Sequence, residues 1–70
     1  MMTDWNAILS NRKNVSLARQ FATGSITGRE FYSHFAGTDT GGEVRSLLRT
    51  GGVNRARTLT RKALNRRNVI

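Results

Sequence analysis

Seven glycines and no proline divide this chain of seventy residues into segments with room only for short helices or strands. The glycines lie singly or in pairs, at Gly24, Gly28, Gly37, Gly41, Gly42, Gly51 and Gly52. Between them, apolar residues recur at the three- and four-residue spacing of a helix, and no segment alternates strongly enough to predict a strand. The sequence therefore predicts an all-α protein, a compact bundle of four to five short helices with a basic C-terminal helix.

Two short helices are expected before Gly24. Thr3 can cap the first, which would run to about Arg12, and Asn14 can cap the second. Apolar side chains of the second helix share one face, because they lie three and four residues apart. They are Leu17, Ala18 and Phe21. Gly24 is expected to end this helix, since glycine readily adopts the left-handed conformation found at helix C-termini.

Two stretches of the form Thr-x-x-Glu, at residues 27–30 and 40–43, predict capping boxes. In such a box the threonine hydroxyl and the glutamate carboxylate bind the free N–H groups of the first helical turn. The first box opens a third helix that ends near Gly37, with Phe31 and Phe35 on its core face. The second box opens a fourth helix that ends before Gly51.

Charged and aromatic residues are unevenly divided along the chain. Residues 43–70 carry eight basic residues and one acidic residue, whereas residues 1–42 carry four basic and three acidic residues. All the aromatic residues lie in the first half, at Trp5, Phe21, Phe31, Tyr32 and Phe35. We therefore expect one domain in two parts, a helical packing unit at residues 1–39 and a basic, helix-turn-helix-like pair at residues 40–70.

The last helix, expected from Val53 to about Arg67, combines a narrow apolar face with basic edges. On a helical wheel its apolar residues occupy an arc of about 140°. They are Val53, Ala56, Leu59, Ala63 and Leu64. One edge carries Arg57 and Arg61, and the other carries Arg55, Lys62 and Arg66. Like charges four residues apart cost a few tenths of a kcal/mol each, and a polyanion would reverse that cost.

Ten of the twelve basic residues are arginine, whose guanidinium group binds phosphate bidentately and reads guanine edges. We therefore expect nucleic acid, either DNA or RNA, to be the partner, bound mainly through its phosphates. The candidate binding residues are the basic side chains of the last two helices, Arg45, Arg49, Arg55, Arg57, Arg61, Lys62, Arg66 and Arg67. This short, arginine-rich, proline-free chain resembles the small regulators and accessory proteins of bacteriophages and mobile elements, which implies an accessory or regulatory role.

Two segments resemble known DNA-binding motifs. Residues 15–35 can be drawn as a helix-turn-helix with its turn at residues 23–26. Residues 47–56 resemble a helix-hairpin-helix, in which a Gly-apolar-Gly hairpin holds a phosphate through backbone N–H groups. Gly52 and Val53 match that hairpin, and Asn54 replaces its second glycine. A plain corner between two helices is the alternative interpretation of the second segment.

Two other functions remain open. The chain could bind an acidic surface of a larger host machine as a protein-interaction module, with apolar residues of its C-terminal segment inserted in a groove. Those residues would be Leu59, Leu64, Val69 and Ile70. It could instead be a structural component packed next to a genome. A homodimer is also possible, because small chains bury more apolar area on association.

Nothing in the sequence indicates an enzyme. His34 is the only histidine, there is no cysteine, and the four acidic residues form no catalytic pair by spacing. We expect no cofactor, no metal and no small-molecule substrate. No apolar run approaches the roughly 20 residues needed to cross a bilayer, and the N-terminus lacks a secretory pattern. The expected location is the cytoplasm, or the host cytoplasm or virion if the protein is viral.

Overall fold

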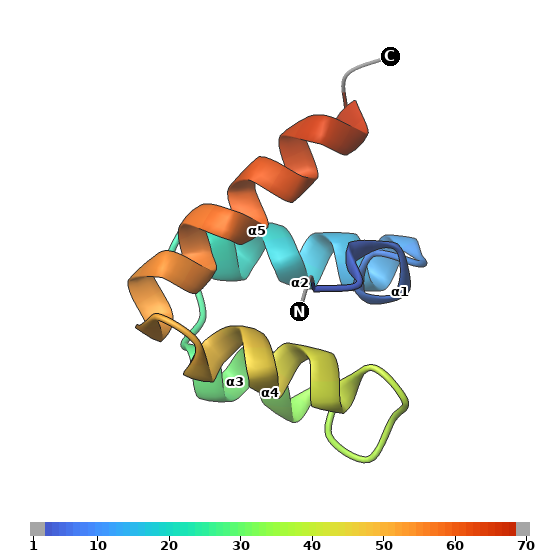
Figure 1. Ribbon diagram of the computed structural model, residues 1–70. Helices are drawn as coiled ribbons and strands as arrows, with labels where there is room; N and C mark the ends of the chain where they lie inside the picture. Colours follow the sequence, from blue (N-terminus) through green and yellow to red (C-terminus); the bar gives the residue numbers. More distant parts are fainter. Residues whose placement is uncertain (1–2, 69–70) are drawn as a thin grey trace.

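The computed structural model describes residues 3–68, which form an all-α fold. Five helices follow one another along this part of the chain: α1 (Trp5–Ile8), α2 (Arg12–Ala22), α3 (Gly28–Ser33), α4 (Gly41–Arg49) and α5 (Gly52–Asn68). In Figure 1, α5 crosses α2 on one side of the molecule, while α3 and α4 lie together beneath them. The predicted fold class, a bundle of short helices that ends in a basic helix, is confirmed.

The first two helices use caps that differ from the predicted ones. The Asp4 carboxylate caps α1 by accepting a hydrogen bond of 3.2 Å from the Ala7 N–H group. Asn11 caps α2 by accepting one of 2.9 Å from the Asn14 N–H group. The predictions of Thr3 and Asn14 as caps were therefore wrong. Asparagine and aspartate are both strong caps, and Asn11 also has the extended backbone that an N-cap requires.

One of the two predicted capping boxes forms. Thr27 accepts from the Glu30 N–H group and the Glu30 carboxylate accepts from the Thr27 N–H group, both at 3.0 Å. Thr40 makes no capping bond, because its backbone is already helical, with φ −84° and ψ −8°. The Glu43 carboxylate instead accepts a bond of 3.2 Å from the Asp4 N–H group. The second predicted box was wrong, and its glutamate links α4 to the start of α1.

Left-handed glycines separate the helices at two predicted positions. Gly24 follows α2 with φ +84°, Gly51 lies between α4 and α5 with φ +86°, and Gly52 begins α5 with φ +85°. Residues other than glycine rarely adopt these angles, so the glycines fix where the chain turns. The third helix ends earlier than predicted, at Ser33 rather than near Gly37.

Residues from every helix meet in one hydrophobic core. At its centre the ring of Phe21 stacks on that of Phe31, with the centroids 4.6 Å apart and the planes 2° from parallel. The ring of Phe35 packs edge-on against that of Phe31, with the two centroids 5.2 Å apart. Phe31 and Phe35 are buried, as their spacing predicted. The core joins side chains of residues 1–39 to those of residues 40–70.

The buried face of α5 is displaced from the predicted stripe. Ala56, Ala63 and Leu64 are buried, but Val53 is 42% exposed. Thr60 is fully buried in its place, and its hydroxyl donates to the Ala56 carbonyl at 2.7 Å. That internal bond satisfies the hydroxyl, so a polar residue can lie in the interface with α2. The small side chains on this face allow the two helices to pack closely.

The two threonines at the predicted boxes offer a matched comparison of capping strength. We expect Thr27→Ala to lower the free energy of unfolding by about 1 kcal/mol, because it removes a formed N-cap bond. Thr40→Ala should change it by less than about 0.5 kcal/mol, because the Thr40 hydroxyl caps nothing. Urea unfolding followed by circular dichroism measures both. Equal losses for the two variants would contradict the capping assignment.

Candidate nucleic-acid interface

Two of the eight predicted binding residues, the half-buried Arg57 and the exposed Arg61, bond to backbone carbonyls of other segments. The Arg57 guanidinium donates to the carbonyls of Phe21 and Ile26, at 3.3 and 3.4 Å, and lies 4.9 Å above the Phe21 ring centroid. Arg61 donates to the Ala22 carbonyl at 3.4 Å. Because α2 ends at Ala22, its last carbonyls lack partners within the helix and carry a partial negative charge. Arg57 and Arg61 add donors and positive charge at this helix end, where the Phe21 carbonyl also accepts from the Gly24 N–H group. Arg57 also reaches the Ile26 carbonyl in the loop after α2.

The other six predicted residues are exposed. Two lie on α4 and four on α5, and they are Arg45, Arg49, Arg55, Lys62, Arg66 and Arg67. In the part of the chain that the structure describes, the hydrogen bonds donated by arginine side chains come from Arg57 and Arg61. The two basic edges predicted for the last helix thus differ in role. One donates to carbonyls of α2 and of the loop after it, and the other lies on the surface.

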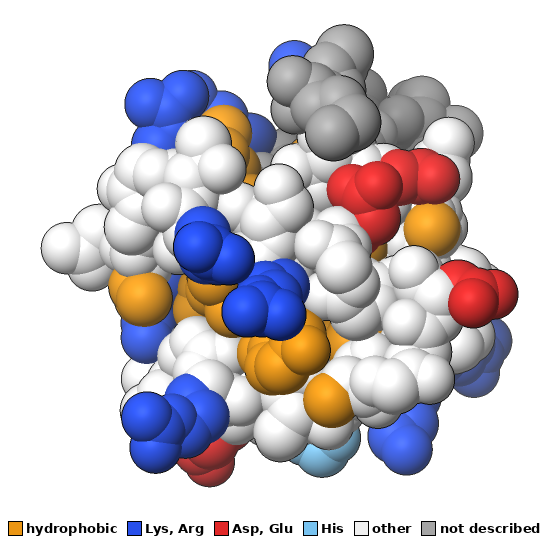
Figure 2. Space-filling model, turned by 60° about the horizontal axis from the view of Figure 1, so that its bottom comes forward, with side chains coloured by type: hydrophobic (Ala, Val, Ile, Leu, Met, Phe, Trp, Pro, Cys, Tyr) orange, Lys and Arg blue, Asp and Glu red, His pale blue; other side chains and the backbone are white. Residues whose placement is uncertain are grey.

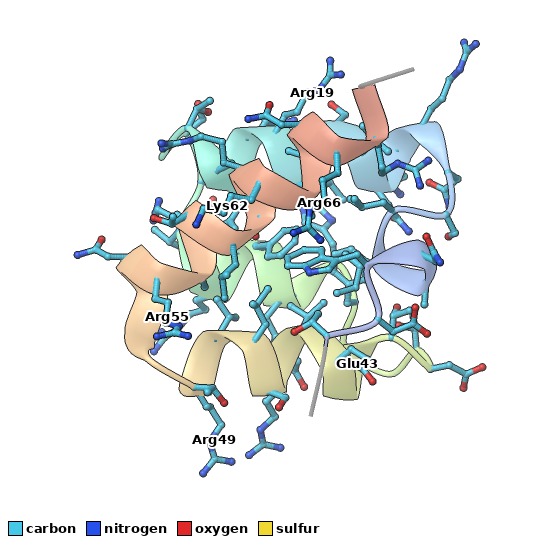
Figure 3. The ribbon with its side chains drawn as sticks, turned by 45° about the horizontal axis from the view of Figure 1, so that its top comes forward. Arg19, Glu43, Arg49, Arg55, Lys62 and Arg66 are labelled. Atoms are coloured by element: carbon cyan, nitrogen blue, oxygen red, sulfur yellow. The ribbon has the colours of Figure 1, made fainter. Side chains whose placement is uncertain are left out.

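The exposed edge of α5 borders a groove between α1, α4 and α5. Two depressions make up this groove, and both are lined by Trp5, Leu59 and Arg66. Arg55 lies at the end of the groove near α4, and Lys62 lies toward the opposite end. We refer to the two depressions together as the Trp5 groove. Figure 3 shows Arg66 extending from α5 over the middle of this side of the molecule.

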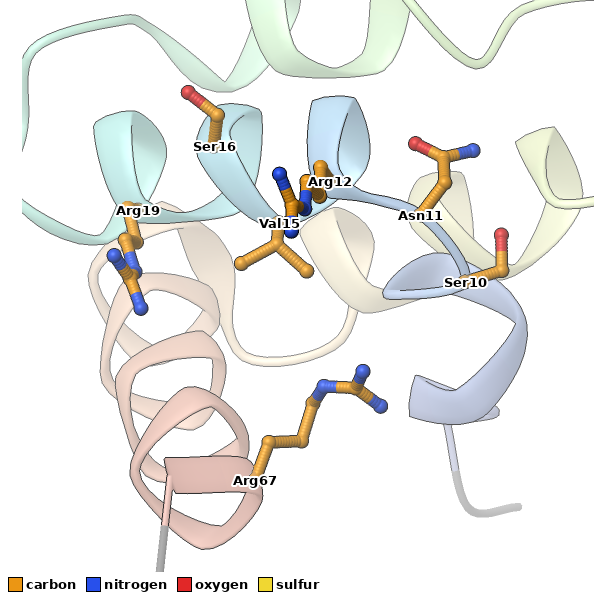
Figure 4. Close-up of a pocket in the computed structure, with 7 residues that line it drawn as sticks. All are labelled: Ser10, Asn11, Arg12, Val15, Ser16, Arg19 and Arg67. Atoms are coloured by element: carbon orange, nitrogen blue, oxygen red, sulfur yellow. The ribbon is translucent and has the colours of Figure 1, made fainter.

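A further pocket lies between the start of α2 and the end of α5. Three arginines line it, Arg12 and Arg19 from α2 and Arg67 from α5, together with the polar side chains of Ser10, Asn11 and Ser16. Figure 4 shows Arg67 reaching into this pocket, with the two arginines of α2 on the facing wall. Since no acidic residue lines it, the pocket favours an anion.

Neighbouring depressions share lining residues, so they follow one another across the surface. Arg67 lines both the α2 pocket and the Trp5 groove. At the other end of the groove, Ser46 and Thr50 also line a shallow depression that contains Arg45 and Arg49. We call the whole series the basic track, and its cations are Arg12, Arg19, Arg67, Lys62, Arg66, Arg55, Arg45 and Arg49. In Figure 3, Arg19, Arg66 and Arg49 lie at successive levels from α2 past α5 to α4.

The acidic residues lie outside the lining of the track. Glu43 is at the start of α4, where it contacts the Asp4 backbone, at the opposite end of that helix from Arg49. On the face shown in Figure 2, basic side chains occur at separate places and acidic side chains lie among and beside them. That face therefore offers no continuous positive surface.

Three residues of the track were missed in the sequence. Arg12 and Arg19 lie seven residues apart on α2, a spacing that places them on one helix face, but they were discounted because the first half is nearly neutral overall. Trp5 was assigned to the core, whereas it is half-buried and lines the groove. No local pattern separates a groove tryptophan from a core tryptophan, so the sequence carried no signal for it.

Several other predicted features have definite places. Leu64 is buried, so the idea that it inserts into a partner was wrong, and Leu59 is half-buried in the groove. Val69 and Ile70 lie outside the described residues. Tyr32 is half-buried and His34 is exposed. Val53 and Asn54 are exposed at the start of α5, within the segment that resembles a helix-hairpin-helix.

Comparisons of the chain with family models, curated proteins and solved structures found no match. Within residues 3–68, no helix has both the length and the apolar character that a membrane crossing requires. Function must therefore be argued from the arrangement of side chains in this chain alone.

The different roles of the two basic edges of α5 can be tested by the effect of single substitutions on the free energy of unfolding of the protein. We expect Arg57→Gln to lower the free energy of unfolding by about 1–3 kcal/mol, because it removes charged hydrogen bonds and a cation–π contact. The matched variant Arg55→Gln should change it by less than about 0.5 kcal/mol, because Arg55 is exposed. Urea unfolding of both proteins gives the comparison, and similar values for the two would refute the internal role of Arg57.

Proposed function

We propose that this protein binds nucleic acid along the basic track and acts as a small accessory or regulatory protein of the bacteriophage or mobile-element kind. Arginine side chains would contact the phosphate backbone, which gives affinity with little dependence on sequence. Arg57 and Arg61 are left out of the binding set because they serve the fold. Arg12 and Arg19 are added to it because they share a pocket with Arg67.

The observation that carries this proposal is the grouping of eight cations from three helices around depressions that share lining residues. A chain with a net charge of +8 would lower its self-repulsion by spreading its cations evenly over the surface. Here they converge without interleaved carboxylates, so each cation raises the electrostatic potential at its neighbours. A row of phosphates turns this unfavourable arrangement into a favourable one, as counterions are released on binding.

The salt dependence of binding is the primary test. If about six of the eight cations contact phosphates, the slope of log affinity against log salt concentration on duplex DNA should be about −5. Fluorescence anisotropy of labelled duplex DNA, single-stranded DNA and RNA over a salt series measures this slope. A flat salt response on all three would end the proposal.

Charge-matched variants locate the interface. We expect Arg55→Gln combined with Arg66→Gln to make the duplex slope less negative by about 2, because each neutralised contact contributes about 0.9. Lys13→Gln combined with Arg29→Gln removes the same charge from exposed positions outside the track and should leave the slope nearly unchanged. Equal effects of the two pairs would mean that net charge, and not the track, determines binding.

An acidic protein surface could occupy the same track through its carboxylates, and a pull-down before and after nuclease treatment separates the two partners. Loss of the captured material on nuclease treatment supports nucleic acid. Retention of one acidic protein, together with weak binding to all three nucleic acids, would overturn the proposal in favour of a protein-interaction module.

A further inference from the structure

The only tryptophan of the chain lies in the middle of the basic track. Trp5 packs against core residues on one side, and it lines both depressions of the groove on the other. Its neighbour across the groove is Leu59, which is half-buried and also lines both depressions. An aromatic ring and an aliphatic side chain therefore form an apolar floor between cationic walls.

The facing stripe of α5 places one apolar residue between cationic residues. Arg55, Leu59, Lys62 and Arg66 follow one another at spacings of four, three and four residues, so they share one face of the helix. With a rise of about 1.5 Å per residue, the stripe is about 16 Å long. That length corresponds to a few nucleotides of a single strand. The stripe thus offers phosphate contacts on both sides of one apolar position.

Phosphate contacts alone do not account for this floor. A phosphate is fully charged and gains nothing from contact with an indole ring or a leucine side chain, because that contact removes water from the phosphate. A nucleobase has a flat apolar face that stacks on an aromatic ring, whatever its sequence identity. The bases of a duplex are already stacked and paired inside the helix, so only an unpaired base can reach such a ring.

We propose that the Trp5 groove binds single-stranded nucleic acid, with an unpaired base stacked on the Trp5 indole. The neighbouring phosphates lie on Arg55, Lys62 and Arg66. This inference rests on the proposed function and names its substrate class, a single strand in preference to a duplex. The cations of the rest of the track then hold the strand on either side of the stacked base.

Intrinsic fluorescence of the wild-type protein provides a direct test, because Trp5 is its sole tryptophan. Single-stranded DNA and RNA of about 12 nucleotides should quench this fluorescence as they bind, in the range of site sizes common for single-strand binders. An abasic strand of the same length keeps its phosphates but lacks bases. It should bind more weakly and leave the fluorescence unchanged, and duplex DNA should also leave it unchanged.

Ring-specific variants provide the second test. We expect Trp5→Leu to weaken single-strand binding by about 5- to 150-fold, the loss typical of one base–aromatic stack. Trp5→Tyr keeps an aromatic ring and should recover most of that loss, while both variants should bind duplex DNA as the wild type does. Tyr32→Leu changes the other half-buried aromatic, which does not line the track, and should bind both as the wild type does. Anisotropy of labelled strands measures all affinities.

The outcomes distinguish base stacking on Trp5 from nucleic-acid binding along the basic track. Salt-dependent binding with equal affinity for normal and abasic strands, and no quenching by either, would overturn base stacking while leaving nucleic-acid binding intact. Absence of binding to every strand would overturn both. The wild-type measurement stands without any variant, so a variant that failed to fold would still leave the inference tested.

Discussion

The packing of Phe21 on Phe31 beneath the Arg57 guanidinium connects three helices at one point of the fold. Each ring belongs to a different helix, α2 or α3, and the cation comes from α5. A chain of this length has about 4 to 10 kcal/mol of stability in total, so one buried aromatic pair is a large share of it. Together with the buried side chains of Ala56, Ala63 and Leu64, this contact holds α5 against the core and so positions the cations on that helix.

Much of the fold could be predicted because its determinants are local. The box at Thr27 and the glycines at 24, 51 and 52 depend on residues within a few positions of each other, and they form as expected. The errors arose where distant segments meet. Gly41 lies so close to the Phe35 carbonyl that an added Cβ would be 2.7 Å from that oxygen, and Thr40 before it has a helical backbone and forms no cap. Glu43 is then free to bind the Asp4 backbone.

The candidate site was predictable only in part, for the same reason. A helical wheel correctly separates the two basic edges of α5, but it cannot show that the end of α2 lies against one of them. It also cannot show that Arg12 and Arg19 converge with Arg67. The general rule that large rings are buried predicts a core position for Trp5, but the residue is only partly buried. The hypothesis of an arginine-rich interface therefore stays a proposal. The fold changes which residues are assigned to it, because Arg57 and Arg61 leave the set and Arg12 and Arg19 join it.

The internal placement of Arg57 has a consequence for how such a chain can diverge. Its planar guanidinium reaches two carbonyls at once and covers a ring, which the single ammonium of lysine cannot do. At Arg55 or Arg66 a lysine still supplies a positive charge to a flexible anion. We therefore expect distant relatives to exchange arginine and lysine freely along the track while keeping arginine at position 57. In a family alignment, the most invariant cation would then mark the architecture of the protein and not its ligand.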